Sequence, residues 1–402
     1  MRLIHFPFLI SIIFFSAIAA ALGQEQVKSL PVAFSGSIAG DTASTRFFLD
    51  FDQNLSVKTT YMDKPNRIII DLDESVFNLG EENKIEPRGL ISAVQFGRIS
   101  QGRSRIILTL VEPAEIIKSS FKKRLDEESY RLLLDIDSTD EATFVNLLKE
   151  QKAKSQSNGN LAVKGDRVAP VQKKEGRFTI VIDPGHGGID GGAVGRNGAQ
   201  EKDIVFSFAQ VVRDKLLSTG PFDVLMTRQE DKFMSLRDRL EFSRRSKADL
   251  FISIHADSLR QKFVRGSTIY TLSKKASDLL SAKLAETENS ADLVGGLAVE
   301  EEVEAVSDIL VDLTTSETKR FSRRFSSLLV ENLGSEIRLI KNPQRSAAFG
   351  VLKAPEVPSV LLELGYLSNI EDERLLQSAE FKTKAAQAIA NSVLDFFEPR
   401  MR

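Results

Sequence analysis

Strongly apolar segments alternate with helical segments between Phe178 and Phe397, and this alternation limits the possible fold more than any other feature of the chain. The apolar segments are FTIVIDP, FDVLMTR, DLFISIHAD, GSTIYTLS and VPSVLLELGYLSN. Helices are expected at 202–217, 235–247 and 317–333, and again at the end of the region. Strands that are apolar throughout and are separated by helices form a sheet buried on both faces. The sequence therefore predicts an α/β domain over residues 178–398.

A second short pattern recurs four times between Pro31 and Thr139. Each copy has an arginine, three large apolar residues, Asp or Thr, and one more apolar residue, in TRFFLDF, NRIIIDL, SRIILTL and YRLLLDI. Aliphatic and aromatic runs separated by turn-forming residues indicate strands, and their unequal spacing excludes a solenoid. We expect a small all-β sandwich over residues 31–139.

The arginines of this pattern allow two interpretations. They could line a surface that binds an acidic polymer, or they could pair with the aspartates Asp50, Asp71 and Asp135 of the same strands. The four arginines are Arg46, Arg67, Arg105 and Arg131.

The N-terminal residues are expected to direct export. Arg2 precedes an apolar run from Phe6 to Ala21 that is short for a membrane span and ends in small residues, as signal peptides do. We predict a signal peptide over residues 1–23 with cleavage before Gln24. Cleavage after Ala19 or Ala21, and an uncleaved anchor, are the alternatives. No membrane span is expected after cleavage.

The segment 140–177 has the composition of a flexible basic linker. After a possible short helix, residues 151–177 contain seven Lys or Arg against two acids, with few apolar residues to bury. The charge could hold this segment near an anionic wall, or it could simply keep a tether soluble.

Composition restricts the chemistry. The net charge of −2, from 54 Lys and Arg against 56 Asp and Glu, gives no support for nucleic acid as a partner. The chain has no cysteine and 3 histidines, one of them in the predicted signal peptide. A bound metal would therefore have to be held by imidazole and carboxylate groups.

Both remaining histidines end apolar strands of the predicted sheet. His186 lies in DPGHGG after the first strand, and His255 lies in SIHAD after the third. Functional residues of α/β proteins gather where strands end. Glu201 begins the first helix fifteen residues after His186, where capping alone would also explain a carboxylate. Two imidazoles and one carboxylate are the ligand set of an open catalytic zinc site. A dinucleotide fingerprint fails, because Asp190 stands where glycine is needed, and no phosphate-loop GK[ST] follows.

Glu363 is the expected catalytic residue. It stands in the apolar run VLLELGY, where a buried carboxylate is costly unless it is paired or coordinating. A zinc hydrolase needs a base near the attacking water, and Glu363 is placed to supply it. An ion pair with a neighbouring Lys or Arg is the structural alternative.

Taken together, DPGHGG, the Glu-Lys-Asp helix start, SIHAD and LLELGYLSN resemble the zinc-dependent N-acetylmuramoyl-L-alanine amidases of the amidase_3 family. The resemblance implies a mixed sheet flanked by helices, zinc held by His186, Glu201 and His255, and catalysis by Glu363. Residues 31–139 resemble the AMIN domain, which implies peptidoglycan binding. The domain order resembles that of the Gram-negative division amidases, which implies septal wall splitting in the periplasm.

A long acidic insertion interrupts this domain at about residues 275–318. Between Lys283 and Lys319 it has ten acids and no Lys or Arg. Apolar residues recur every three to four positions between Val299 and Leu313, which predicts an amphipathic helix. A solvated acidic helix is one interpretation. Resemblance to the division amidases implies instead an autoinhibitory helix that an activator protein displaces. Glu302 is the candidate blocking ligand, with Glu300, Glu301 and Glu304 as alternatives.

These observations predict hydrolysis of the amide between N-acetylmuramic acid and the L-alanine of the peptidoglycan stem peptide. Two alternative functions must be distinguished from this amidase activity. A zinc peptidase acting within the stem peptide would use the same metal chemistry. A non-catalytic wall-binding protein would be expected to lack at least one of the site residues.

Overall fold

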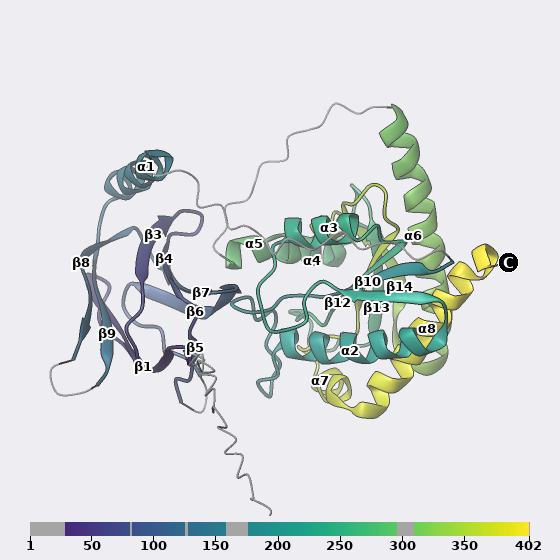
Figure 1. The fold of residues 1–402 in the computed structure, drawn as a ribbon, viewed down its shortest axis with the longest axis horizontal. Coiled ribbons are helices and arrows are strands. Elements are labelled where there is room, and N and C mark those ends of the chain that lie inside the picture. Colours follow the sequence, from purple (N-terminus) through teal and green to yellow (C-terminus); the bar gives the residue numbers. More distant parts are fainter. Residues whose placement is uncertain (1–28, 81–82, 125–127, 158–175, 296–308, 402) are drawn as a thin grey trace, which may run out of the picture. The chain divides into compact units, whose positions relative to one another are not determined.

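The computed structural model describes residues 29–80, 83–124, 128–157, 176–295 and 309–401 of the 402-residue chain (Figure 1). The predicted signal peptide, residues 158–175 of the basic linker and Glu302 lie outside the described residues, so the structure does not test them. None of the helices within the described ranges is long and apolar enough to cross a membrane.

The N-terminal domain is a sandwich of two antiparallel sheets, as predicted. One sheet has the order β5-β1-β2-β9-β8, in which β5 pairs in parallel, and the other has the order β3-β4-β7-β6. The four arginine-containing segments are β2, β4, β7 and β9. The strands are β1 (Val32–Gly40), β2 (Ser44–Phe51), β3 (Val57–Met62), β4 (Arg67–Asp73), β5 (Val76–Phe77), β6 (Ile91–Ser100), β7 (Arg103–Leu110), β8 (Ala114–Lys123) and β9 (Tyr130–Ser138).

Side chains from both sheets form the core of this domain, which includes Phe47, Ile70, Leu108 and Leu134. Three of the four repeated arginines pair with strand aspartates, which favours the ion-pair interpretation over an open basic surface. The shortest nitrogen–oxygen distances are 2.5 Å for Arg46–Asp135, 2.6 Å for Arg105–Asp71 and 2.7 Å for Arg131–Asp50. Helix α1 (Glu141–Ser157) follows the last strand and includes the short helix expected there.

The C-terminal domain is built on a six-stranded mixed sheet with the order β11-β10-β12-β15-β13-β14. All neighbouring pairs are parallel except β13 with β15. The strands are β10 (Phe178–Pro184), β11 (Phe222–Met226), β12 (Leu250–His255), β13 (Ser267–Leu272), β14 (Leu339–Ala347) and β15 (Ser359–Glu363). The helices are α2 (Glu201–Thr219), α3 (Leu236–Arg245), α4 (Leu279–Asn289), α5 (Ala291–Val294), α6 (Ile309–Glu336), α7 (Ile370–Gln377) and α8 (Ala379–Met401), with a 3-10 turn η1 (Gly350–Leu352).

Successive residues of the central strands point to opposite faces of this sheet, as the two-residue period of a strand requires. In β10, Ile180 and Ile182 pack in the core formed with α2, α6 and α8, whereas Val181 belongs to the core on the opposite face. Helices α3 and α4 lie on that opposite face (Figure 1). Burial of both faces explains why the central strands are apolar throughout. The predicted α/β class is confirmed.

Candidate metal and catalytic centre

The turn after β10 forces His186 into a left-handed backbone conformation. His186 has φ of 56°, and Gly187 and Gly188 also have positive φ. Such a conformation is strained for a residue with a side chain, and strain of this kind concentrates at functional sites. Gly185 lies so close to the His255 ring that a Cβ atom at this position would overlap the imidazole. The glycines of DPGHGG therefore allow the two histidines to approach one another.

His186, His255 and Glu201 converge on one point. Glu201 Oε1 lies 3.2 Å from His186 Nε2 and 3.3 Å from His255 Nδ1. The three side chains come from the turn after β10, the end of β12 and the first residue of α2. Backbone N–H groups hold the Glu201 carboxylate in place, because Ala256 donates to Oε1 and Ala193 donates to Oε2, each at 2.8 Å. All three residues are buried.

This arrangement fits a metal ion. His186 Nε2 and His255 Nδ1 are buried, and neither nitrogen forms a hydrogen bond within the described part of the chain. Ligands bound tetrahedrally at about 2.0–2.1 Å are about 3.3 Å apart, which matches the distances to Glu201 Oε1. Two buried imidazole nitrogens that form no hydrogen bond and face one carboxylate oxygen are a donor set that fits a cation.

Asp190 orients one of the two imidazoles. Its Oδ2 lies 2.9 Å from His186 Nδ1, so Nδ1 carries the proton and Nε2 is left free for a metal. Burial alone would lower the pKa of His186, but Asp190 and the neighbouring glutamates raise that pKa well above its usual value. Sequence reasoning did not give Asp190 this role.

Two buried arginines fix the backbone of the histidine turn. Arg228 donates to the carbonyls of Pro184 at 3.1 Å and Gly185 at 3.0 Å. Arg239, from α3, donates to the carbonyl of His186 at 2.8 Å and to Asp183 Oδ1 at 2.6 Å. The carbonyl groups of a strained turn are thereby held from two sides.

Glu363 stands at the end of β15, directly opposite His255 in the register of the sheet. Its side chain is fully buried, and Oε2 accepts a hydrogen bond from the Asp257 N–H at 3.0 Å. Oε1 has no hydrogen-bond partner among the described residues. Burial raises the pKa of Glu363 to about 8. In the described structure it has no salt bridge, so the alternative of a structural ion pair is not supported.

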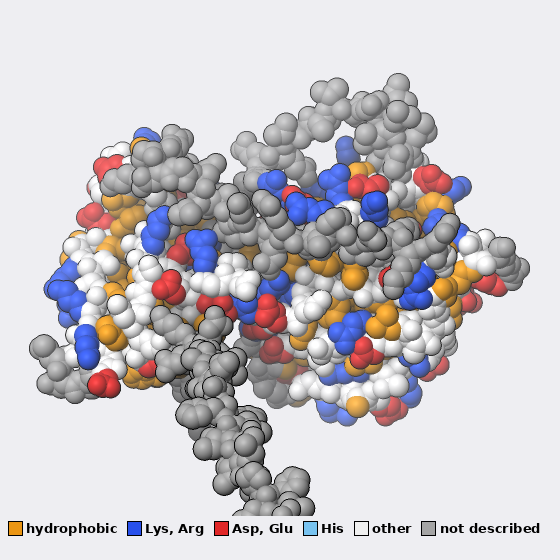
Figure 2. All heavy atoms as spheres, in the orientation of Figure 1, with side chains coloured by type: hydrophobic (Ala, Val, Ile, Leu, Met, Phe, Trp, Pro, Cys, Tyr) orange, Lys and Arg blue, Asp and Glu red, His pale blue; other side chains and the backbone are white. Residues whose placement is uncertain are grey.

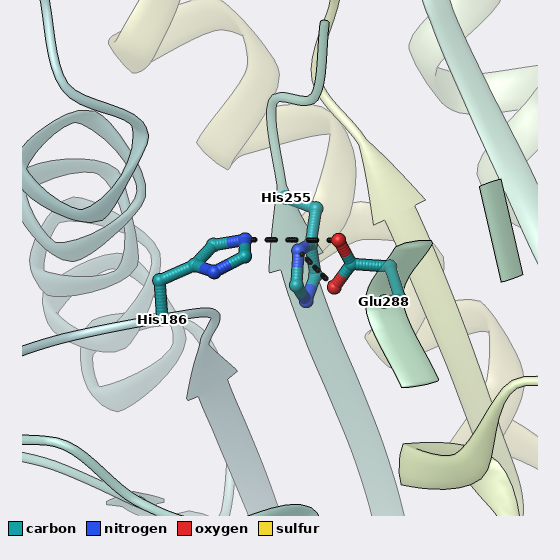
Figure 3. Close-up of side chains that lie close together, drawn as sticks. All are labelled: His186, His255 and Glu288. Atoms are coloured by element: carbon teal, nitrogen blue, oxygen red, sulfur yellow. Dashed lines mark ion pairs between the residues drawn. The ribbon is translucent and has the colours of Figure 1, made fainter. Parts of the chain in front are cut away.

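A fourth acidic side chain enters the centre from the acidic insertion. Glu288, on α4, places Oε2 3.0 Å from His255 Nδ1 and Oε1 3.8 Å from His186 Nε2 (Figure 3). His186, His255 and Glu288 form the compact group of potential metal ligands that Figure 3 shows. The cavity left beside them is about 10 Å³, which is room for one water molecule at most.

Helix α4 is attached to the domain at both ends. Asp278 caps its first turn by accepting from the Ser281 N–H at 2.8 Å, and it pairs with Arg345 of β14 at 3.2 Å. At its last residue, Asn289 accepts from the Gly350 N–H at 2.6 Å and donates to the Ala348 carbonyl at 2.9 Å. Leu284 and Ala285 are buried between these ends.

The structure does not test Glu302 and its three alternatives, because residues 296–308 are not described. Instead it brings in Glu288, which sequence reasoning counted among the ten acids but did not single out. A usable signal was present. Ser281, Leu284, Ala285 and Glu288 follow the spacing of one helix face, and all four are buried. A carboxylate on the buried face of an otherwise ordinary amphipathic helix marks a site.

Comparisons with known proteins agree with this geometry. A family model described as N-acetylmuramoyl-L-alanine amidase matches residues 180–395, and an AMIN domain model matches residues 38–136. The N-acetylmuramoyl-L-alanine amidase AmiC of Neisseria meningitidis serogroup B is 33% identical over 363 residues, 87% of this chain and 86% of that protein. The chain belongs to the N-acetylmuramoyl-L-alanine amidase family. The AmiA amidase of Escherichia coli K12 is 40% identical to this amidase over 227 residues, 56% of this chain and 78% of that protein.

The amidase thus carries an AMIN domain before its catalytic domain, and its substrate is peptidoglycan. Acidic and basic side chains are interspersed over the face seen in Figure 2, and no histidine is visible there. This agrees with the burial of His186 and His255, which are 7% and 4% exposed.

Proposed function

We propose that this amidase uses zinc, cuts peptidoglycan in the periplasm during septal wall splitting, and is held inactive by α4 until an activator protein displaces that helix. The observation that carries the inhibition is the Glu288 carboxylate, which an inserted helix brings against both histidines. The small remaining cavity supports the same conclusion.

Zinc is the ion that the donor set supports best. His186, Glu201 and His255 supply two nitrogens and one oxygen, which is the ligand set of an open catalytic zinc site, and the chain has no thiolate to offer. When bound, zinc would polarise the scissile carbonyl and lower the pKa of a water molecule.

Glu363 carries the proton in the proposed reaction. It accepts a proton from the attacking water and delivers it to the leaving amine of L-alanine. A general acid–base group works best when its pKa lies near the working pH, and burial moves the pKa of Glu363 in that direction. The Asp257 N–H holds Oε2, so the unpartnered Oε1 is the atom available for proton transfer.

Glu288 competes with the substrate for the centre. Its carboxylate lies on the open side of the histidine pair, where a fourth ligand would stand. We therefore assign the blocking role to Glu288 rather than to Glu302. An activator protein that binds α4 only after the helix has left the site would shift the population toward the open enzyme.

The location rests on two features of the chain. The predicted signal peptide would export the amidase, and the absence of cysteine suits an oxidising compartment in which packing alone holds the fold. The AMIN domain would then concentrate the enzyme on peptidoglycan, with the division septum as the expected place of action.

Digestion of purified sacculi by the full-length amidase carrying Glu288→Ala, in which the proposed inhibition by α4 is removed, tests the catalytic part of this proposal. Mass spectrometry should find intact stem peptides, whereas shortened peptides would indicate a peptidase and no product at any zinc concentration would indicate a wall-binding protein. Metal analysis should find zinc in the active protein. Glu363→Gln should keep its zinc and release no peptide; normal release by this variant would contradict the assigned role.

The inhibition needs a separate comparison. Glu288→Ala should raise basal peptide release by about tenfold or more. A loss of about 1.4 kcal/mol from the contacts that hold α4 in the site shifts the equilibrium between closed and open enzyme tenfold. Glu286→Ala is the matched control, because Glu286 is exposed two residues earlier on α4 and its carboxylate pairs with the exposed Lys283. Equal activity of the two variants would contradict inhibition by Glu288.

A further inference from the structure

The loop between β12 and β13 carries an unusual group of exposed residues. Its sequence SLRQKFVRG, residues 258–266, has three basic residues and no acid. Phe263 at its tip is 81% exposed, more than any other aromatic side chain among the described residues. We call residues 258–266 the basic loop.

The basic loop is held by its own contacts, so its exposed residues are presented in fixed positions. Leu259 is buried, and its N–H donates to Ser368 Oγ at 3.0 Å. Asn369 Nδ2 donates to the carbonyl of Lys262 at 2.8 Å. The loop ends where the Gly266 N–H donates to Asp372 at 2.8 Å.

The loop begins at the catalytic centre. It starts three residues after His255, and the segment 364–369 that supports it starts directly after Glu363. The two segments leave the centre side by side, because the Leu364 N–H donates to the carbonyl of His255 at 2.9 Å and the Leu367 N–H donates to that of Asp257 at 2.8 Å. The basic loop is therefore joined directly to both segments that carry the centre, and a substrate that extends from the centre along these segments would meet the loop.

Arg260 and Lys262 have no acidic partner within the described residues. Both side chains are exposed, whereas Arg265 pairs with Asp372. Exposed cations next to a catalytic centre raise the local concentration of an anionic substrate. The stem peptide is such a substrate, since its side-chain-linked glutamate keeps a free carboxylate, whereas the glycan strand is neutral once the lactyl group is amidated.

We propose that the basic loop binds the stem peptide, with Arg260 and Lys262 contacting its carboxylates and Phe263 packing on its alanine methyl groups. This inference rests on the proposed function and extends it to substrate recognition. The loop acts on binding and takes no part in the proton transfer.

The test uses soluble muropeptides and full-length protein with Glu288→Ala as the common background, so that the inhibitory helix does not limit access. Arg260→Glu with Lys262→Glu should raise KM by about tenfold and leave kcat and zinc content unchanged. Phe263→Ala should raise KM by a smaller factor. The matched control is Arg244→Glu with Arg245→Glu, which makes the same charge change at the end of α3, before β12 begins.

A muropeptide whose stem carboxylates are converted to amides provides the decisive comparison. On this substrate, the Glu288→Ala protein and its Arg260→Glu with Lys262→Glu variant should have the same KM. The amidated peptide no longer carries the carboxylates with which the two basic side chains would interact. A tenfold difference that persists on the amidated substrate would overturn the proposal. If Phe263→Ala raises KM and the charge reversals do not, the loop would contact the glycan and not the stem peptide. That result would also overturn the proposal.

Binding of uncleaved muropeptide to the Glu363→Gln protein separates this inference from the proposed function. Weaker binding by the loop variants supports the loop even if no variant cleaves the amide. If the loop substitutions leave muropeptide binding unchanged while the amidase cleaves normally, the role of the basic loop is contradicted and the proposed function is not.

Discussion

At the scale of single residues, the centre depends on groups that never touch the substrate. His186 holds an unfavourable backbone conformation because Arg228 and Arg239 bind the carbonyls around it. Asp190 sets which nitrogen of His186 is free. These contacts fix the ligand geometry before any metal arrives, which lowers the cost of binding it.

Replacement of Asp190 should weaken metal binding without unfolding the domain. We expect Asp190→Ala to lose about 10–100-fold in zinc affinity, because His186 would no longer be held in one tautomer and orientation. Asp190→Asn should lose less, since the amide oxygen can still accept from Nδ1. Competition with a chromophoric chelator measures both affinities. Equal affinity of Asp190→Ala and the parent protein would exclude the orienting role.

Asp183 should make stability depend on pH. Burial alone would raise its pKa, but Arg239 and hydrogen bonds from Thr227 and Ser253 keep the pKa below its usual value. A carboxyl group with a lowered pKa stabilises the folded state above its unfolded pKa of about 3.9, and this stabilisation is lost as the pH falls through the folded pKa.

Asp183→Asn tests this contribution. The variant should cost about 3–5 kcal/mol at neutral pH, because the buried Arg239 charge loses its partner. In urea unfolding, the gap between the two proteins should stay constant above about pH 4 and narrow below it, where the parent carboxylate also becomes protonated. A gap that does not change with pH would contradict this account.

At the scale of elements, α4 carries the proposed blocking group and packs on the catalytic domain. Its face of Ser281, Leu284, Ala285 and Glu288 fits the sheet, and Asn289 attaches its end to the backbone before η1. Glu288 and Asn289 are adjacent, so in the proposed displacement of α4 the blocking group and its attachment would leave together.

Loss of the Asn289 hydrogen bonds to Ala348 and Gly350 should partly activate the enzyme. Asn289→Ala removes two hydrogen bonds, each worth about 0.5–1.5 kcal/mol, and so should raise basal release of stem peptides by about fivefold or more. Thr287→Ala is the control, since its hydroxyl bonds only within the helix, to the carbonyl of Lys283. The rate of peptide release from sacculi is the measurement. Equal rates for the two variants would show that Asn289 does not hold the helix.

The elements that the sequence predicted share one property, which is a strong apolar pattern. Strands β10, β12 and β15 are buried on both faces and could be recognised from composition alone. The sequence analysis did not identify β14, because LIKNPQRSA is a polar edge strand with a proline. The helix predicted from apolar spacing at 299–313 lies largely outside the described residues and stays a prediction, whereas the spacing in α4 that points to Glu288 is shorter and weaker.

The same limit applies to the candidate site. His186, Glu201, His255 and Glu363 were predictable because strand ends and a helix start bring them to one sheet edge. Asp190 and Asp257 follow the predicted residues closely in sequence, but their contacts depend on turn geometry that no spacing rule gives. Arg239 acts on the His186 carbonyl from a separate helix, which only the folded structure reveals.

At the scale of the whole molecule, the proposed function assigns wall binding to the AMIN domain and chemistry to the catalytic domain. The AMIN sandwich pairs three of its repeated arginines internally, so its affinity for the wall should not depend on a simple basic surface. A tethered binding domain raises the effective concentration of its partner near the substrate. Targeting and catalysis should therefore be separable by truncation.

The N-terminal domain should bind sacculi by itself. A protein of residues 24–139 is expected to pellet with purified sacculi, and the catalytic domain alone should bind more weakly than the full chain. Cosedimentation at increasing salt measures both. If the N-terminal domain remains in the supernatant at low salt, targeting must come from elsewhere in the chain.

The closed position of α4 also has a kinetic consequence. If α4 opens as proposed, an ion bound by His186, Glu201 and His255 would escape only from the open state, because the cavity beside Glu288 is too small for a chelator to enter. With excess chelator, the rate of zinc loss should reach a plateau that equals the opening rate of α4. The plateau rate of zinc loss would therefore report the opening rate of α4. An activator protein would be recognised by the increase that it causes in this rate.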